Sequence, residues 1–153
     1  MSKPLQNQHP TGVTTGTAQR PGQPHTGNAM TFDLADEARR LRQEDAWQRN
    51  DHNARTLVKE HHLRVVALAM KEGGRLPEHL VEGGVTVHVI SGSVRVSADA
   101  RQIVLNPGHL LVLDYATQFG VAATEEAEVL LTIVYGPSGD PAPAVLFDAE
   151  SQA

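Results

Sequence analysis

The sequence predicts an all-β domain, a small barrel or sandwich, with one short helix before it and an N-terminal arm without regular structure. Three observations support this prediction. Short β-branched or leucine-rich runs recur from residue 54 onward, turn residues separate them about every ten residues, and no second helical pattern of useful length appears. A chain of 153 residues fits a single domain with one core.

Composition limits which residues can form the core and which classes of partner the chain can bind. Hydrophobic residues make up 40% of the chain and aromatic residues only 4%, so the core must consist of Val, Leu, Ile and Ala. The formal net charge of -5 repels phosphate backbones and anionic lipids, and we therefore expect no nucleic-acid or membrane partner. The absence of cysteine excludes disulfides, thiolate metal sites and cysteine nucleophiles. With neither a secretion signal nor a membrane-spanning run, a cytoplasmic protein is expected.

Residues 1–30 differ in composition from the rest of the chain. They contain four prolines and four glycines and have no apolar periodicity. Such a segment buries too little apolar surface to offset its ordering entropy, so we expect a disordered polar arm. The predicted domain then covers residues 31–136, and 137–153 form a C-terminal tail. A regulatory role for the arm is an alternative, which deletion of residues 1–30 would test through loss of partner capture.

The domain begins with a short helix in "FDLADEARRLRQEDAW". Asp33 can cap the helix, and acidic residues follow in its first turn. Leu34, Ala38 and Leu41 recur at helical spacing and form one narrow apolar face. We expect this helix to lie across a sheet.

The strands follow as runs with a period of two. These runs are "ARTLVKE", "LRVVALAM", "VTVHVI", "SVRVSA", "RQIVL", "HLLVL" and "EVLLTIVY". Gly92, between two of them, is placed for a hairpin turn with positive φ, and "NPG" gives Gly108 a left-handed position. "VVALAM" is apolar on both faces, which predicts a homodimer that covers its outer face.

Taken together, these pieces resemble the small single-domain cupins, a family of double-stranded β-helix (jelly-roll) barrels. The resemblance covers residues 32–135. It rests on "ARTLVKEHHLRVVALAMKEGGRLPEH", "VTVHVISGSVRV", "LNPGHLLVLD" and "EEAEVLLTIVY". In the first cupin motif a glycine precedes a Pro-x-His strand, and a glycine ends the following strand. A Pro-Gly turn opens the second motif, and here that turn is Pro107-Gly108.

The resemblance implies a metal site of histidines and a carboxylate that point into the barrel. His79 stands at the first ligand position and Val81 at the second. Val85 stands where the carboxylate would be and Phe119 at the last histidine, while a shift of one residue would bring Gln118 there. A divalent ion needs three or four nitrogen or oxygen donors, so we expect no metal and no cofactor.

These positions also define the predicted pocket. Its wall comprises His79, Val81, Val85 and Phe119, and Tyr115 and Gln118 frame its mouth. His79 is either a structural imidazole on an apolar wall or a polar handle for a ligand. We expect a metal-free cupin-like protein that binds a small molecule or serves as a structural or sensing module, without catalysis. The alternative is a metal-dependent oxygenase or isomerase that uses Fe, Mn, Ni or Zn on His79 and unrecognised ligands.

Overall fold

A computed structural model describes residues 29–136, so the predicted arm lies almost wholly outside the described residues and the predicted tail wholly outside them. The helices and strands occur in the order expected of one short helical segment followed by β-structure. They are α1 (Leu34–Gln43), α2 (Asp45–Arg49), β1 (His52–Lys59), β2 (Leu63–Met70), β3 (Arg75–Leu80), β4 (Gly84–Ser91), β5 (Val94–Ala98), β6 (Arg101–Leu105), β7 (Leu110–Leu113), β8 (Gln118–Ala123) and β9 (Ala127–Val134).

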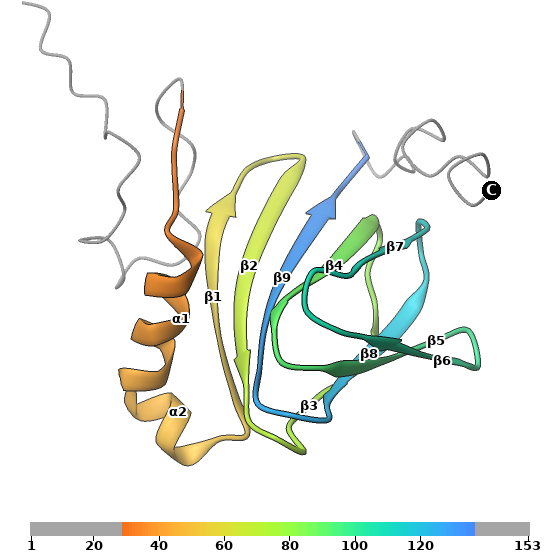
Figure 1. Ribbon diagram of the computed structural model, residues 1–153. Helices are drawn as coiled ribbons and strands as arrows, with labels where there is room; N and C mark the ends of the chain where they lie inside the picture. The colour runs from red at the N-terminus through yellow and green to blue at the C-terminus, as the bar shows by residue number, and fades with distance from the viewer. Residues whose placement is uncertain (1–28, 137–153) are drawn as a thin grey trace, which may run out of the picture.

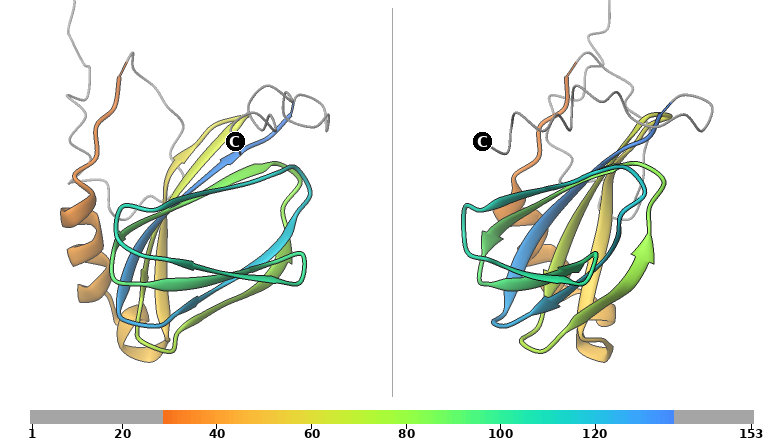
Figure 2. Two further views of the ribbon diagram at one scale, coloured as in Figure 1. Left: turned by 45° about the vertical axis from the view of Figure 1, so that its right-hand side comes forward. Right: turned by 90° about the vertical axis from the view of Figure 1, so that its right-hand side faces the viewer.

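The strands form two antiparallel sheets that face each other. The five-stranded sheet has the order β1-β2-β9-β4-β7, and the four-stranded sheet has the order β3-β8-β5-β6. The two sheets enclose a barrel, and the helices lie outside the five-stranded sheet (Figures 1 and 2). The predicted all-β barrel with one leading helical segment is therefore confirmed. Within residues 29–136 neither helix is long and apolar enough to span a membrane.

Alternating side chains fill the space between the sheets. Along β9 every second residue from Ala127 is buried, and β5 alternates in the same way from Val94. We call the resulting apolar cluster the barrel core. Its buried members are Leu68, Met70, Val81, Val85, Val87, Val89, Val94, Val96, Ala98, Leu105, Leu113, Phe119, Val121, Ala123, Ala127, Val129, Leu131 and Ile133.

Helix α1 covers the outer face of the five-stranded sheet. As predicted, Asp33 caps it, and the Asp33 side chain accepts a hydrogen bond from the Asp36 amide at 3.1 Å. A second apolar cluster, the seam cluster, lies between helix and sheet and consists of Leu41, Trp47, Leu57, Val58, Ala67 and Ala69. The outer face of β2 is thus covered by the same chain, so it gives no reason of its own to expect a second subunit.

A buried ion pair ties α1 to β1. The Arg55 guanidinium donates to Glu37 Oε2 at 2.9 Å and also contacts Glu44, and the Arg55 and Glu37 side chains are only 7% and 4% exposed. Arg42 ties the same helix to β9, because its guanidinium donates to Glu128 Oε1 at 2.8 Å. The helix therefore packs through charged contacts at the rim of the seam cluster as well as through apolar ones.

Gly92 does not form the hairpin expected from the sequence. It has the predicted positive φ, 72°, but the strands on either side belong to different sheets, β4 to the five-stranded and β5 to the four-stranded. A Cβ added at Gly92 would lie 2.1 Å from the carbonyl oxygen of Glu126. The glycine therefore lets the chain change sheets while passing close to the turn between β8 and β9. Gly108 also has the predicted positive φ, 85°.

Asp51 holds the start of β3 in place. Its backbone carbonyl accepts from the Lys71 amide at 2.9 Å, and its carboxylate accepts from the Arg75 amide at 3.0 Å. The His52 ring lies 2.7 Å from the other carboxylate oxygen. These contacts favour the ionised carboxylate, so the Arg75 amide first and the His52 ring second hold the pKa of Asp51 below its usual value of 3.8.

This lowered pKa predicts a pH-dependent contribution to stability. A carboxylate with a depressed pKa in the folded state stabilises the fold above its unfolded-state pKa, and the contribution is lost as the pH falls through the folded-state value. Asp51→Asn should therefore be less stable than the wild type at neutral pH, and the difference should shrink below about pH 4. Urea unfolding of both proteins over a pH series measures it, and a difference that is independent of pH would contradict the prediction.

Candidate functional site

A β-bulge in β3 determines where His79 lies. Leu76 pairs with Val121 and His79 pairs with Phe119, so three steps along β3 match two steps along β8. Pro77 lies within this irregularity, where its missing N–H removes no hydrogen bond from a regular ladder. Because of the bulge, Leu76 and His79 both lie on the barrel side of the sheet despite their odd spacing.

The His79 ring packs against Phe119 at the exposed end of β3. The ring centroids are 4.9 Å apart with planes inclined at 44°, and Nδ1 lies 3.0 Å from the Pro77 carbonyl oxygen. A carbonyl only accepts, so Nδ1 carries the proton in this contact, and in the neutral ring Nε2 is an acceptor. Within residues 29–136 no hydrogen bond to Nε2 is formed.

The other three ligand positions implied by the cupin resemblance belong to the barrel core. Val81, Val85 and Phe119 are 9%, 2% and 0% exposed and join one apolar cluster. The structure thus brings these three together and sets His79 at their solvent-exposed edge. Among residues 29–136, no three His, Asp or Glu side chains gather in a way that could hold a metal ion.

Tyr115 and Gln118, which the sequence suggests for the pocket mouth, lie in and after the β7–β8 loop. Tyr115 is half-buried, and its amide donates to the Asp114 carboxylate at 2.7 Å. Gln118 is exposed and pairs with Leu80, so it faces away from the side on which His79 meets Phe119. The structure does not bring Gln118 to the barrel core.

The other histidines of the described region stand apart from His79, and one of them, His52, contacts the Asp51 carboxylate as described above. His61 and His62 lie at the turn between β1 and β2, where their rings contact each other edge to face. His88 alternates with the buried Val87 and Val89 and so faces out of the barrel. His109 lies just before β7, and its Nδ1 accepts from the Asn106 amide at 3.0 Å. Each is engaged locally or points away from the barrel core.

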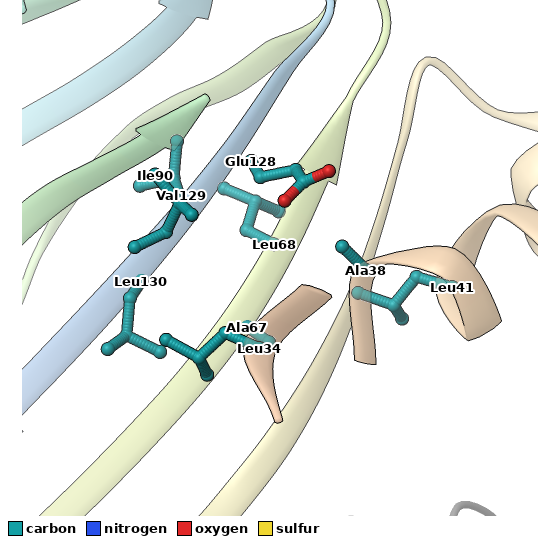
Figure 3. A pocket seen from close by; sticks show the side chains of 9 residues that line it. All are labelled: Leu34, Ala38, Leu41, Ala67, Leu68, Ile90, Glu128, Val129 and Leu130. Atoms are coloured by element: carbon teal, nitrogen blue, oxygen red, sulfur yellow. The ribbon is translucent and has the colours of Figure 1, made fainter. Parts of the chain in front are cut away.

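A narrow gap lies in the seam between α1 and the five-stranded sheet (Figure 3). Leu34, Ala38 and Leu41 border it from the helix, and residues of β2 and β9 border it from the sheet. Its volume is only ≈ 10 Å³, which is scarcely enough for a single water molecule, and its one carboxylate, Glu128, is held by Arg42. We regard it as a packing gap.

A larger hollow lies on the outer face of the four-stranded sheet, where the sequence suggested no site. Its volume is ≈ 410 Å³, and its lining includes Arg75, Glu78, Arg95, Ser97, Gln102 and Gly120. Strand alternation in "VRVS" places Arg95 and Ser97 on the outer face, and that signal was available in the sequence. The strand runs predicted from the sequence do not include β8, the strand that lies between the two sides of the hollow, so the sequence alone does not bring these residues together.

Comparison with solved structures identifies the fold. A conserved protein of unknown function from Streptococcus pyogenes matches with a TM-score of 0.59 and 20% identity over 76% of this chain and 96% of its own. A cupin superfamily protein from Desulfitobacterium hafniense gives 0.55 and 15%, over 57% and 80% of the two chains. An RmlC-like cupin from Shewanella frigidimarina gives 0.53 and 17%, over 58% and 80%. No family model and no curated protein sequence matches the chain.

Proposed function

We propose that this chain, which has the fold of the small cupin-domain proteins, works as a metal-free binding or structural module and not as a metalloenzyme. Three buried positions carry the proposal. Val81, Val85 and Phe119 stand where a cupin-type site would hold its second, third and fourth ligands, and all three belong to the barrel core. Hydrocarbon side chains have no lone pair to give to a cation, so His79 alone is too small a ligand set.

For a small-molecule ligand at the barrel mouth, we propose His79 as the polar contact. Its Nε2 is an acceptor on the solvent side of Phe119, while the Pro77 carbonyl fixes the ring through Nδ1. Tyr115 in the neighbouring β7–β8 loop is the further contact that we propose, because Gln118 faces the other side of the sheet. We expect the protein to act in the cytoplasm.

Metal analysis tests the proposal directly. Untagged protein is incubated in turn with Fe(II), Mn(II), Ni(II) and Zn(II), desalted, and analysed for metal by mass spectrometry beside His79→Ala. We expect far less than one ion per chain, and the same residual amount in both proteins. His88→Ala is a matched control, because it removes another imidazole, one that faces out of the barrel.

The alternative function, a metal-dependent oxygenase or isomerase, predicts the opposite result. It requires at least two more donor atoms within about 2.2 Å of a metal bound to His79. Near-stoichiometric metal that is lost in His79→Ala and kept in His88→Ala would overturn the proposal and favour this alternative.

We also propose that the chain forms a homodimer, now for a reason other than the outer face of β2. Strand β7 is an edge of the five-stranded sheet, and it carries Leu110 and Val112 with 59% and 47% of their surfaces exposed. An edge strand presents unpaired backbone groups, and two copies of β7 paired about a two-fold axis would cover both these groups and the apolar side chains.

Light scattering coupled to size-exclusion chromatography tests the dimer. The wild type should elute with twice the chain mass, and the double variant Leu110→Lys/Val112→Lys should elute with the chain mass. Leu80→Lys is the matched control, since Leu80 is equally exposed, at 57%, but lies on β3 of the other sheet. A wild-type mass equal to that of one chain would contradict the proposal.

A further inference from the structure

The hollow on the outer face of the four-stranded sheet forms because its central strand carries small residues and its flanking strands carry long ones. The outward positions of β8 that border the hollow are Gly120 and Ala122. Arg75 of β3 and Arg95 of β5 pair with Ala122 from its two sides. The floor of the hollow therefore consists of backbone atoms and the Ala122 methyl group, and the side chains of Arg75 and Arg95 border it on two sides.

The two arginines can reach one ligand. Neighbouring strands lie about 4.8 Å apart, which places the Cα atoms of Arg75 and Arg95 about 10 Å from each other across Ala122. Within residues 29–136 neither side chain forms an ion pair or a hydrogen bond, whereas Arg39, Arg40, Arg42 and Arg55 are all engaged by carboxylates. Arginine binds carboxylates through two parallel N–H donors, and here two such forks face the same hollow.

The residues around Gly120, next to the two arginines, supply neutral polar groups and one carboxylate to the hollow. Ser97 lies between Gly120 on one side and Gln102 on the other. Glu78 comes from the bulge of β3 and lies over Gly120, because a Cβ added at Gly120 would be 2.9 Å from Glu78 Cγ. A glycine inside a strand is unfavourable unless something approaches it closely, and here the bulge does so.

The charges of the hollow indicate the ligand class. Two guanidiniums and one carboxylate leave a formal charge of +1, which suits a monoanion better than a dianion in a chain whose net charge is -5. An ionised Glu78 accepts hydrogen bonds only, so it requires a donor on the ligand. We infer that this outer hollow binds a small hydroxylated monocarboxylate, with the carboxylate between Arg75 and Arg95 and a hydroxyl group on Glu78.

This inference is independent of the metal-free barrel. The hollow lies on the opposite face of the sheet from His79 and Phe119, so its ligand need not contact the barrel core. A volume of ≈ 410 Å³ falls within the range of small-molecule sites and suits a ring of about six carbons with its substituents.

Four probe molecules test which chemical groups of the ligand the hollow recognises. Quinate carries a ring, hydroxyl groups and one carboxylate; cyclohexanecarboxylate lacks the hydroxyl groups, inositol lacks the carboxylate, and inorganic phosphate supplies a different anion. We expect quinate to bind saturably by calorimetry and by amide chemical shifts in β5 and β8. The other three should bind at least about tenfold more weakly, which is the scale of one charge-assisted hydrogen bond. Added salt should weaken quinate binding.

Variants then locate the site. Arg75→Gln and Arg95→Gln should each weaken quinate binding about tenfold, and Glu78→Gln should reduce the preference for quinate over cyclohexanecarboxylate. Arg101→Gln is the matched control, because Arg101 is an exposed arginine of β6 in the same sheet outside the hollow. His79→Ala should leave quinate binding unchanged.

Several outcomes would overturn the inference. They are the absence of saturable quinate binding, binding that is unaffected by Arg75→Gln and Arg95→Gln, and tighter binding of phosphate than of quinate. Loss of quinate binding in His79→Ala, with no change in the arginine variants, would move the ligand to the barrel mouth and overturn the outer hollow as its site.

Discussion

Replacement of Phe119 by alanine is expected to lower the free energy of unfolding by about 3–5 kcal/mol. Phe119 is fully buried and is the largest such side chain in the described part of the chain. It fills the part of the barrel core beneath His79, and its own strand β8 is paired with β3 on one side and β5 on the other, so the site has little room to collapse. Urea or guanidinium unfolding, followed by circular dichroism, measures the loss.

Two variants make this result interpretable. Phe119→Leu keeps most of the apolar volume and should cost considerably less than the alanine variant. Val104→Ala removes methyl groups from a side chain that is 53% exposed, and it should change the free energy of unfolding by less than about 0.5 kcal/mol. If Phe119→Ala behaved like Val104→Ala, the barrel would not be tightly packed at this point, and an open cavity there would have to be considered.

Loss of Arg55 is expected to have a similarly large effect, for an electrostatic reason. Arg55→Ala removes the guanidinium that compensates the Glu37 carboxylate at the buried junction of α1 with β1. Removal of one partner from a buried ion pair typically costs about 3–5 kcal/mol, because the remaining charge stays in a poorly solvated place. The same unfolding experiment measures it, and the loss of helix signal should coincide with the loss of sheet signal.

A double variant separates the charge from the packing. Arg55→Met/Glu37→Leu replaces both partners by apolar groups and should recover most of the stability lost in Arg55→Ala. Arg39→Ala, which breaks the exposed ion pair with Asp36, should cost at most about 1 kcal/mol. Equal losses in Arg39→Ala and Arg55→Ala would contradict the importance of burial at this junction.

Much of the fold could be predicted from local patterns. The cap at Asp33, the positive φ values of Gly92 and Gly108, and seven of the strands follow from residue type and spacing, because each depends on near neighbours in sequence. The pairing of those strands does not. The expected hairpin at Gly92 is wrong because a short turn between two strands looks the same in sequence whether the chain stays in one sheet or changes to the other.

Strand β8 is absent from the strands predicted by the sequence for a different reason. Gly120 at its centre reads as a turn residue, and only the bulge of β3 that brings Glu78 over it explains why a strand contains glycine there. That bulge also explains why Leu76 and His79, three residues apart, lie on the same face of the sheet. A long-range contact of this kind leaves no periodic signal in the sequence.

The site was predictable in part. The motif spacing of the cupin resemblance groups Val81, Val85 and Phe119, and in the structure all three belong to the barrel core. That they line a ligand pocket stays a prediction. Arg75 and Arg95 lie near each other because both pair with Ala122 of β8. Their proximity therefore cannot be predicted from the sequence unless β8 is recognised as the strand between them. Likewise, the apolar outer face of β2 suggested a second subunit until α1 was seen to cover it.

The anchoring of α1 also bears on where this domain can be cut. A fragment that starts at β1 would contain every strand, yet it would expose Leu57, Ala67 and Ala69 to water and would remove the carboxylates that hold Arg55. Because Phe32 also packs against the seam cluster, the smallest autonomously folding piece has to include it. The helical segment before β1 would look dispensable if only the barrel strands were aligned with other proteins. Because it packs on the sheet, it unfolds in the same cooperative transition as the barrel.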